Sequence, residues 1–156
     1  MKNFFLSVII SALIFVPSLV SASDWTQQES GTMQSIRGIT QASDNLIAVG
    51  NTGYTMYSSD DGATWELSDK ISSTWWYDVT TQPNGIAVAV GDSGAYASTS
   101  DGGVTWSPIS LAISEALYAI DRTDDYGYIV GASGRALYFG SNTWHTATTN
   151  VTLPIY

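Results

Sequence analysis

The sequence contains no cysteine, a single histidine and only five lysines and arginines among its 156 residues. Without cysteine there is no disulfide framework, no lipid attached through a thiol and no thiolate metal site. His145 alone offers no partnered base for nucleophilic catalysis. Fourteen acidic residues give a net charge of −9, which repels phosphate backbones and anionic membranes. These absences argue against a nucleic-acid partner and a catalytic triad, and the sequence predicts no cofactor.

The first 22 residues form a segment of their own. Lys2 precedes an apolar stretch from Phe4 to Val16, and the segment closes on small residues that end at Ala22. The stretch is shorter than the ~20 residues that a spanning helix needs. We therefore predict a signal peptide over 1–22 that is cleaved after Ala22. The domain, 23–156, is then exported to the periplasm or the medium and has no membrane attachment after cleavage.

A motif of about forty residues recurs three times in the exported part. Each copy has a Val-Gly-x-x-Gly turn followed by a tryptophan. The turns lie at Gly50/Gly53, Gly91/Gly94 and Gly131/Gly134, and the tryptophans at Trp65, Trp106 and Trp144. The period is 41 and then 40 residues, which divides the domain into repeats at about 33–72, 73–113 and 114–150.

Each repeat reads as four short strands and no helix. The first strand alternates apolar and polar residues, whereas the second, for example 86–90, is continuously apolar and so covered on both faces. We expect the turn glycines to adopt backbone angles that residues with a Cβ resist. A four-stranded unit of this length is typical of a propeller blade. The predicted fold is all-β, a partial β-propeller of about three blades.

The loop between the third and fourth strands carries a second motif, the Asp box S-x-D-x-G-x-T-W. One copy matches in full and the other begins with Thr99. The motif residues are Ser58, Asp60, Gly62, Thr64, Trp65, Asp101, Gly103, Thr105 and Trp106. We expect the Asp carboxylate to accept hydrogen bonds from its own turn, the glycine to be left-handed and the tryptophan to pack into the blade. The third repeat is two residues shorter here and lacks the Asp.

The Val-Gly-x-x-Gly turn followed by Ser-Asp-Gly-Gly-Val-Thr-Trp at 100–106 resembles the photosystem II stability/assembly factor family. The resemblance covers essentially all of 23–156. It implies a propeller fold and a chaperone-like scaffold that acts on newly made photosystem II subunits at the lumenal face. This chain has about three repeats where the family has about seven. The family's functional surface is an arginine patch, for which only Arg37, Arg122 and Arg135 are available.

Candidate binding residues cluster on the first strand of each repeat. Tyr77 aligns with Tyr118 and with Arg37, and Trp75 adjoins them. One interpretation places these residues in the core, as also for Trp76. The other places Arg37, Trp75, Tyr77 and Tyr118 around a mouth near the propeller axis, where they would bind a protein or a sugar.

The sequence gives less support to an enzymatic or metal-binding function. Asp boxes also occur in sialidases, but the chain lacks the arginine cluster and the arginine-isoleucine-proline motif of those enzymes. The string Gly-Asp-Ser-Gly at 91–94 imitates a protease motif, yet it is one copy of the repeated turn. No calcium loop surrounds the aspartates, namely Asp60, Asp61, Asp101, Asp124 and Asp125. No metal site is predicted.

The sequence therefore predicts an exported, non-catalytic β-propeller scaffold that binds a protein partner of unknown identity. The alternative is a carbohydrate-binding propeller module, and a third is a sialidase-like glycoside hydrolase fragment. An arc of three blades leaves two end faces open. Either copies of the chain associate to complete a ring, or the sequence is part of a longer propeller.

Overall fold

The computed structural model describes residues 27–69 and 71–147, so the predicted signal peptide and its cleavage point lie outside the described residues. The described part contains strands and single turns of 3-10 helix (η). In chain order they are β1 (Ile36–Ala42), β2 (Asn45–Gly50), η1 (Asn51–Gly53), β3 (Thr55–Ser58), β4 (Glu66–Leu67), β5 (Trp76–Thr81), β6 (Ala87–Gly91), η2 (Asp92–Gly94), β7 (Tyr96–Thr99), β8 (Ser107–Pro108), β9 (Leu117–Arg122), β10 (Gly127–Gly131), η3 (Ala132–Gly134), β11 (Ala136–Gly140) and β12 (Thr143–Thr146). None of the described helices is long and apolar enough to cross a membrane.

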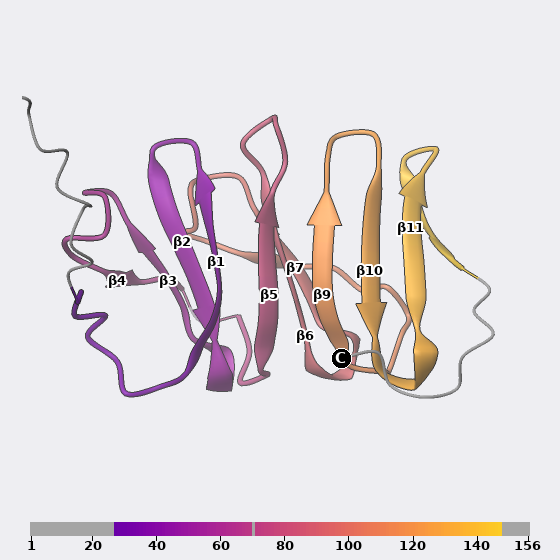
Figure 1. The fold of residues 1–156 in the computed structure, drawn as a ribbon, viewed down its shortest axis with the longest axis horizontal. Coiled ribbons are helices and arrows are strands. Elements are labelled where there is room, and N and C mark those ends of the chain that lie inside the picture. Colours follow the sequence, from indigo (N-terminus) through magenta and orange to yellow (C-terminus); the bar gives the residue numbers. More distant parts are fainter. Residues whose placement is uncertain (1–26, 70, 148–156) are drawn as a thin grey trace, which may run out of the picture.

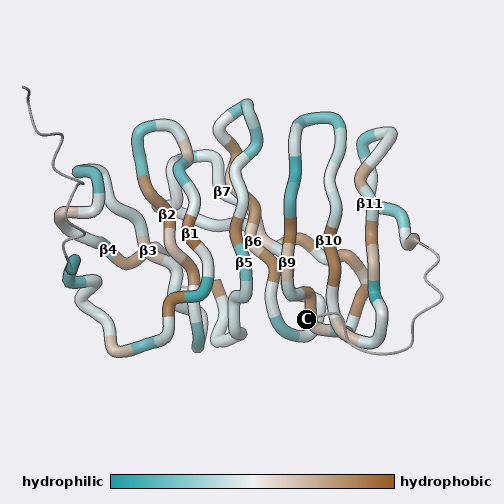
Figure 2. Tube along the Cα trace, viewed as in Figure 1, coloured by the Kyte–Doolittle hydropathy of each residue, from teal (hydrophilic) through white to brown (hydrophobic). Residues whose placement is uncertain are grey.

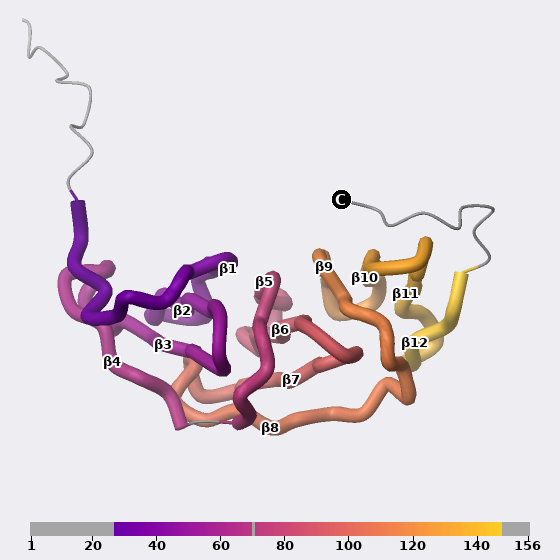
Figure 3. The backbone as a smooth tube through the Cα atoms, turned by 90° about the horizontal axis from the view of Figure 1, so that it is seen from below, coloured from indigo at the N-terminus to yellow at the C-terminus, as the bar shows by residue number. Residues whose placement is uncertain are grey.

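The strands form three four-stranded antiparallel sheets, each a simple meander. Their orders are β1-β2-β3-β4, β5-β6-β7-β8 and β9-β10-β11-β12. The sheets stand side by side as slices of an arc, with β1, β5 and β9 along its inner side and β8 on its outer side (Figures 1 and 3). This arrangement is part of a β-propeller. It confirms the predicted fold class and the four strands of each repeat.

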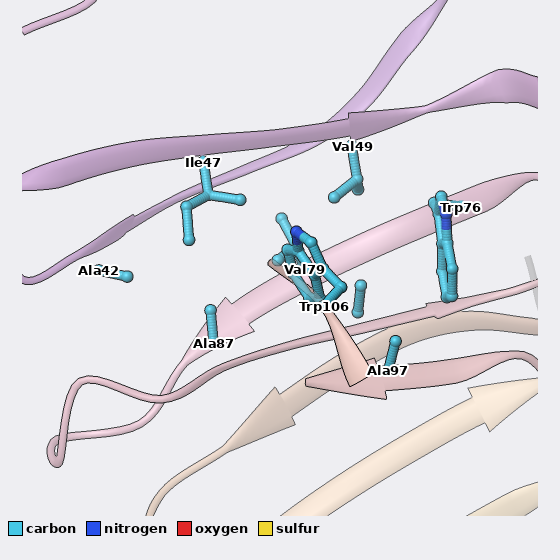
Figure 4. Close-up of a cluster of buried hydrophobic side chains, with 9 residues drawn as sticks. Ala42, Ile47, Val49, Trp76, Val79, Ala87, Ala97 and Trp106 are labelled. Atoms are coloured by element: carbon cyan, nitrogen blue, oxygen red, sulfur yellow. The ribbon is translucent and has the colours of Figure 1, made fainter. Parts of the chain in front are cut away.

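The core lies between the sheets. Every residue of β6 is buried. Figure 4 shows one layer, in which Ile47 and Val49 of the first sheet meet Val79 and Trp106 of the second. A second layer joins the second sheet to the third. Hydrophobic residues follow the strands and hydrophilic ones gather at the hairpin tips (Figure 2). The second sheet buries both of its faces, as its continuously apolar second strand predicts.

The two glycines of each Val-Gly-x-x-Gly turn have different roles. Gly94 has a φ of +71°, as expected. Gly91, however, is extended, and the expectation of an unusual backbone angle is wrong there. A Cβ on Gly91 would lie 2.2 Å from the Trp75 carbonyl oxygen, which accepts a 2.8 Å hydrogen bond from the Asp92 N–H. The first glycine is therefore needed for close approach of two backbone segments, and Gly50 and Gly131 stand in the same relation to Ser35 and Ala116.

The Asp boxes form the expected turns. Asp60 Oδ1 accepts the Thr64 N–H at 2.8 Å, and Oδ2 accepts the Thr64 hydroxyl at 2.6 Å. The Thr64 hydroxyl and backbone, with the Ser58 hydroxyl, hold the pKa of Asp60 below its usual value. Gly62 is left-handed at +88°. The expectation for the tryptophan differs between copies: Trp106 is 7% exposed and donates to the Gly103 carbonyl, whereas Trp65 is only half-buried.

The third repeat replaces the Asp box with a two-residue hairpin. Gly140 pairs with Thr143, and the residues between them, Ser141 and Asn142, have φ of +51° and +62°. Two successive left-handed residues define a tight turn whose twist matches that of the strands. Asn is among the residues that tolerate this conformation best. The missing Asp is thus a change of turn type, and Trp144 still packs against the preceding sheet.

Candidate functional site

A β-bulge occurs at the same point of each inner strand. The pairing register shifts between Ile36 and Gly38, between Trp76 and Asp78, and opposite Val130 and Gly131. The extra residues are Arg37, Tyr77 and Tyr118. A bulge re-aims the side chain of its extra residue, because that residue has no direct partner across the ladder. The equivalence that the alignment of the repeats predicts for these three residues is confirmed.

The re-aimed side chains line one open hollow of about 640 Å³. Its walls are Ile36, Arg37, Trp75, Tyr77 and Tyr118. The structure therefore brings together all four residues that the sequence singled out, from three different sheets. Ile36 was not predicted to line a binding surface, because an isoleucine at the start of a strand is usually expected in the core.

The Arg37 guanidinium lies near two aromatic rings. The guanidinium carbon lies 5.5 Å from the centre of the Trp75 ring and 5.3 Å from that of Tyr77, which is within the range of cation–π attraction. Its Nε donates to the Asn51 side-chain oxygen at 2.5 Å. Asn51 belongs to the turn after β2, and no sequence signal linked it to Arg37.

The two tyrosines complete the hollow. The rings of Tyr77 and Tyr118 meet edge to face with centres 5.5 Å apart. Burial, with a smaller contribution from Asp92 and against the opposing effect of Arg37, raises the pKa of Tyr77 above its usual value. The Tyr77 phenol therefore keeps its proton throughout the neutral range and can donate a hydrogen bond.

The neighbouring tryptophans divide between the two interpretations. Trp76 is 2% exposed and belongs to the core between the first and second sheets. Trp75 is 43% exposed and lines the hollow. The core interpretation is thus confirmed for Trp76 and wrong for Trp75, because adjacent residues of an extended chain point to opposite sides.

The other two described arginines are engaged elsewhere. Arg122 lies 3.8 Å over the Phe139 ring and donates to the Tyr96 hydroxyl at 2.9 Å. Arg135 pairs with Glu115, and this contact lowers the pKa of that carboxyl. Neither arginine lines the hollow. The arginine patch implied by the family resemblance is therefore reduced, in this hollow, to Arg37.

The residues that line the hollow can form hydrogen bonds and aromatic contacts with a ligand. The hollow offers one guanidinium, aromatic faces and phenol hydroxyls, with no carboxylate or imidazole among its lining residues. Within 27–69 and 71–147, no group of three or more His, Cys, Asp and Glu side chains could hold a metal ion. Asp60 and Asp101 are committed to their own turns. Such a surface suits an extended peptide or a sugar.

Fold and hollow together define a class: part of a β-propeller with an open hollow, lined by aromatic residues and one arginine, on the inner side of the arc. No protein-family model and no curated protein matches the sequence. Among solved structures, "YCF48 from Cyanidioschyzon merolae" superposes with a TM-score of 0.68 at 18% identity, over 81% of this chain and 44% of that one. "YCF48 bound to D1 peptide" superposes with a TM-score of 0.61 at 17% identity, over 80% and 43%. This likeness shows the fold, and the chain spans less than half the length of either structure.

Proposed function

We propose that the protein is an exported, non-catalytic scaffold that binds a segment of a protein partner in the hollow around Arg37, Trp75, Tyr77 and Tyr118. The observation that carries the proposal is the convergence of three bulge side chains, one from each sheet, on one surface. Aromatic residues and arginine are the side chains that most often dominate protein–protein binding energy.

The comparison with solved structures supports a peptide ligand in particular. One of the two similar structures is described as bound to D1 peptide. A scaffold that takes part in photosystem II assembly, as the family resemblance of the sequence implies, is the specific form of the proposal. The sequence features of 1–22 support export, which places the encounter with the partner outside the cytoplasm.

The test is site-specific photo-crosslinking followed by binding measurements. A photoreactive amino acid replaces Tyr118, and the crosslinked partner is identified by mass spectrometry from the exported fraction of the source organism. A peptide from the crosslinked segment, and separately a D1 peptide, is then titrated against the protein. We expect Tyr77→Ala and Arg37→Ala each to weaken binding about tenfold or more.

The matched control is Tyr126→Ala, because Tyr126 is 67% exposed and does not line the hollow. It should leave the affinity unchanged. Peptide binding that survives Tyr77→Ala and Arg37→Ala would overturn the proposal, since the partner would then occupy another surface.

The exposed ring of Trp75 favours a second candidate, a carbohydrate-binding module. Aromatic faces open to solvent can stack against sugar rings, and Trp75 is 43% exposed on an open hollow. Binding on a glycan array that Trp75→Ala abolishes, without any peptide ligand, would replace the scaffold by this alternative. Turnover of a sialoside would instead revive the hydrolase fragment.

A further inference from the structure

The first and second strands pair in the same register in all three sheets, so the burial of equivalent residues can be compared between sheets. Opposite the second strand, Ile36 of the first sheet corresponds to Trp76 and Leu117, and Ile39 corresponds to Val79 and Ile120. The four residues of the second and third sheets are at most 6% exposed, because each faces the preceding sheet. Ile36 is 39% exposed and Ile39 is 61% exposed. We call this surface of the first sheet the leading face.

The opposite end shows the complementary pattern. Ile47 and Val88, which point toward the next sheet, are 0% and 1% exposed. Their counterpart in the third sheet is Tyr128, which is 62% exposed and pairs with Tyr138, itself 44% exposed. We call this surface the trailing face. Each end therefore presents large apolar side chains at positions that are buried inside the arc.

A glycine slot marks where the two kinds of face interlock. A Cβ on Gly103 would lie 2.9 Å from Ile47 of the preceding sheet, so the absence of a side chain makes room for that isoleucine. Gly62 is the counterpart of Gly103 in the first sheet. The only atoms near its Cβ position belong to Leu46 and Trp65 of its own sheet. The leading face therefore keeps a slot with no described side chain from a neighbouring sheet in it.

Polar groups on the two faces also match. Inside the arc, the hydroxyls of Thr40 and Thr81 hydrogen-bond at 3.0 Å across the first interface. By register, Thr40 corresponds to Asp121 on the trailing face and Thr81 to Gln41 on the leading face. An amide N–H of Gln41 can donate to the Asp121 carboxylate, so the same contact can form between copies.

We propose that the trailing face of one copy binds the leading face of a second copy, with Tyr128 against Ile39 and the Gly62 slot. The molecule itself displays the apolar part of this interface twice, between its first and second sheets and between its second and third. The glycine slot and the pair of hydroxyls occur at the first of these two interfaces. Because the two surfaces differ, the contact is heterologous: it closes into a ring if the rotation allows and otherwise stacks copies in a row.

Sedimentation velocity and light scattering on the exported protein over a range of concentrations test this proposal. The wild type should form assemblies of two or more copies. Ile39→Asp and Tyr128→Asp should each weaken association at least about tenfold, because each buries an unpaired charge. Both side chains are exposed within one copy, so the circular dichroism spectrum should stay unchanged. Ile109→Asp, at a residue 44% exposed but on neither face, is the control and should associate like the wild type.

Mixing the two variants gives the decisive result. The Ile39→Asp chain keeps its trailing face and the Tyr128→Asp chain keeps its leading face, so the mixture should form a dimer while each variant alone stays monomeric. A wild type that is monomeric at every concentration overturns the proposal, as does a mixture that fails to dimerise. Neither result bears on peptide binding in the hollow, which is measured separately.

Discussion

Asp101 shows how one carboxylate fixes a turn. It accepts the Thr99 hydroxyl at 2.7 Å, the Thr105 hydroxyl at 2.6 Å and the Thr105 N–H at 3.0 Å. Burial alone would raise the pKa of Asp101, but the hydrogen bonds from Thr105 and Thr99 outweigh it and lower the pKa below its usual value. The turn is therefore held by the ionised form of the side chain.

We expect Asp101→Asn to lower the free energy of unfolding at neutral pH by about 1 kcal/mol, discounted for the exposure of the turn. The folded pKa lies below the unfolded value of about 3.9. The stabilisation is therefore complete above that value and is lost as the pH falls through the folded pKa. Urea unfolding at a series of pH values should give a difference in the free energy of unfolding between wild type and variant. This difference should be constant above about pH 5 and should decrease below about pH 4.

The control for this measurement is Asp124→Asn, because Asp124 accepts no hydrogen bond from the described residues and lies in an exposed hairpin. It should change neither the stability nor its dependence on pH. A difference for Asp101→Asn that persists undiminished at low pH would show that packing of the turn, and not its charge, supplies the stabilisation.

At the scale of elements, the turn after each second strand packs closely against the backbone that leads into the first strand of the same sheet. Gly91 sits against the Trp75 carbonyl, 2.2 Å from where a Cβ would be. The atoms that this Cβ would meet belong to the backbone, and the Trp75 carbonyl also accepts a hydrogen bond from the Asp92 N–H. The strain of a side chain there could not be relieved by a rotamer change.

Gly91→Ala should therefore lower the free energy of unfolding by about 3 kcal/mol, at the upper end for overpacking. Gly140→Ala is the matched control: its Cβ would meet only the Tyr138 ring at 3.8 Å, an ordinary contact. Thermal and urea unfolding of the two variants give the comparison. Equal stabilities would mean that the backbone at Gly91 shifts freely, contrary to the role assigned to it.

The elements were largely predictable and their fine geometry was not. Apolar periodicity and the repeated motifs predicted twelve strands in three sheets, because burial on two faces leaves a continuous apolar run such as 87–91. The bulges carry no such signal, since a one-residue register shift depends on pairing with the second strand. For that reason the sequence aligned Arg37, Tyr77 and Tyr118 but left open whether they lie in the core or around one mouth, and it gave no sign that Asn51 accepts a hydrogen bond from Arg37.

At the scale of the whole molecule, the described sheets contact only their neighbours, as in a repeat protein. Stability is then a sum of terms for each sheet and each interface. The second sheet has two interfaces, and all of β6 is buried between them. The first and third sheets have one interface each, which is why Ile39 and Tyr128 are exposed.

Amide hydrogen exchange of the Ile39→Asp variant, in which the end faces should stay uncovered, tests this nearest-neighbour description. We expect the amides of β6 to exchange slowest, those of β2 and β10 faster, and those of the outer strands β4 and β8 fastest, because an end sheet can open by breaking a single interface. Equal protection of β2, β6 and β10 would show that the three sheets open only together. Under that result one sheet could not detach from the others, and the three sheets would unfold as one cooperative unit.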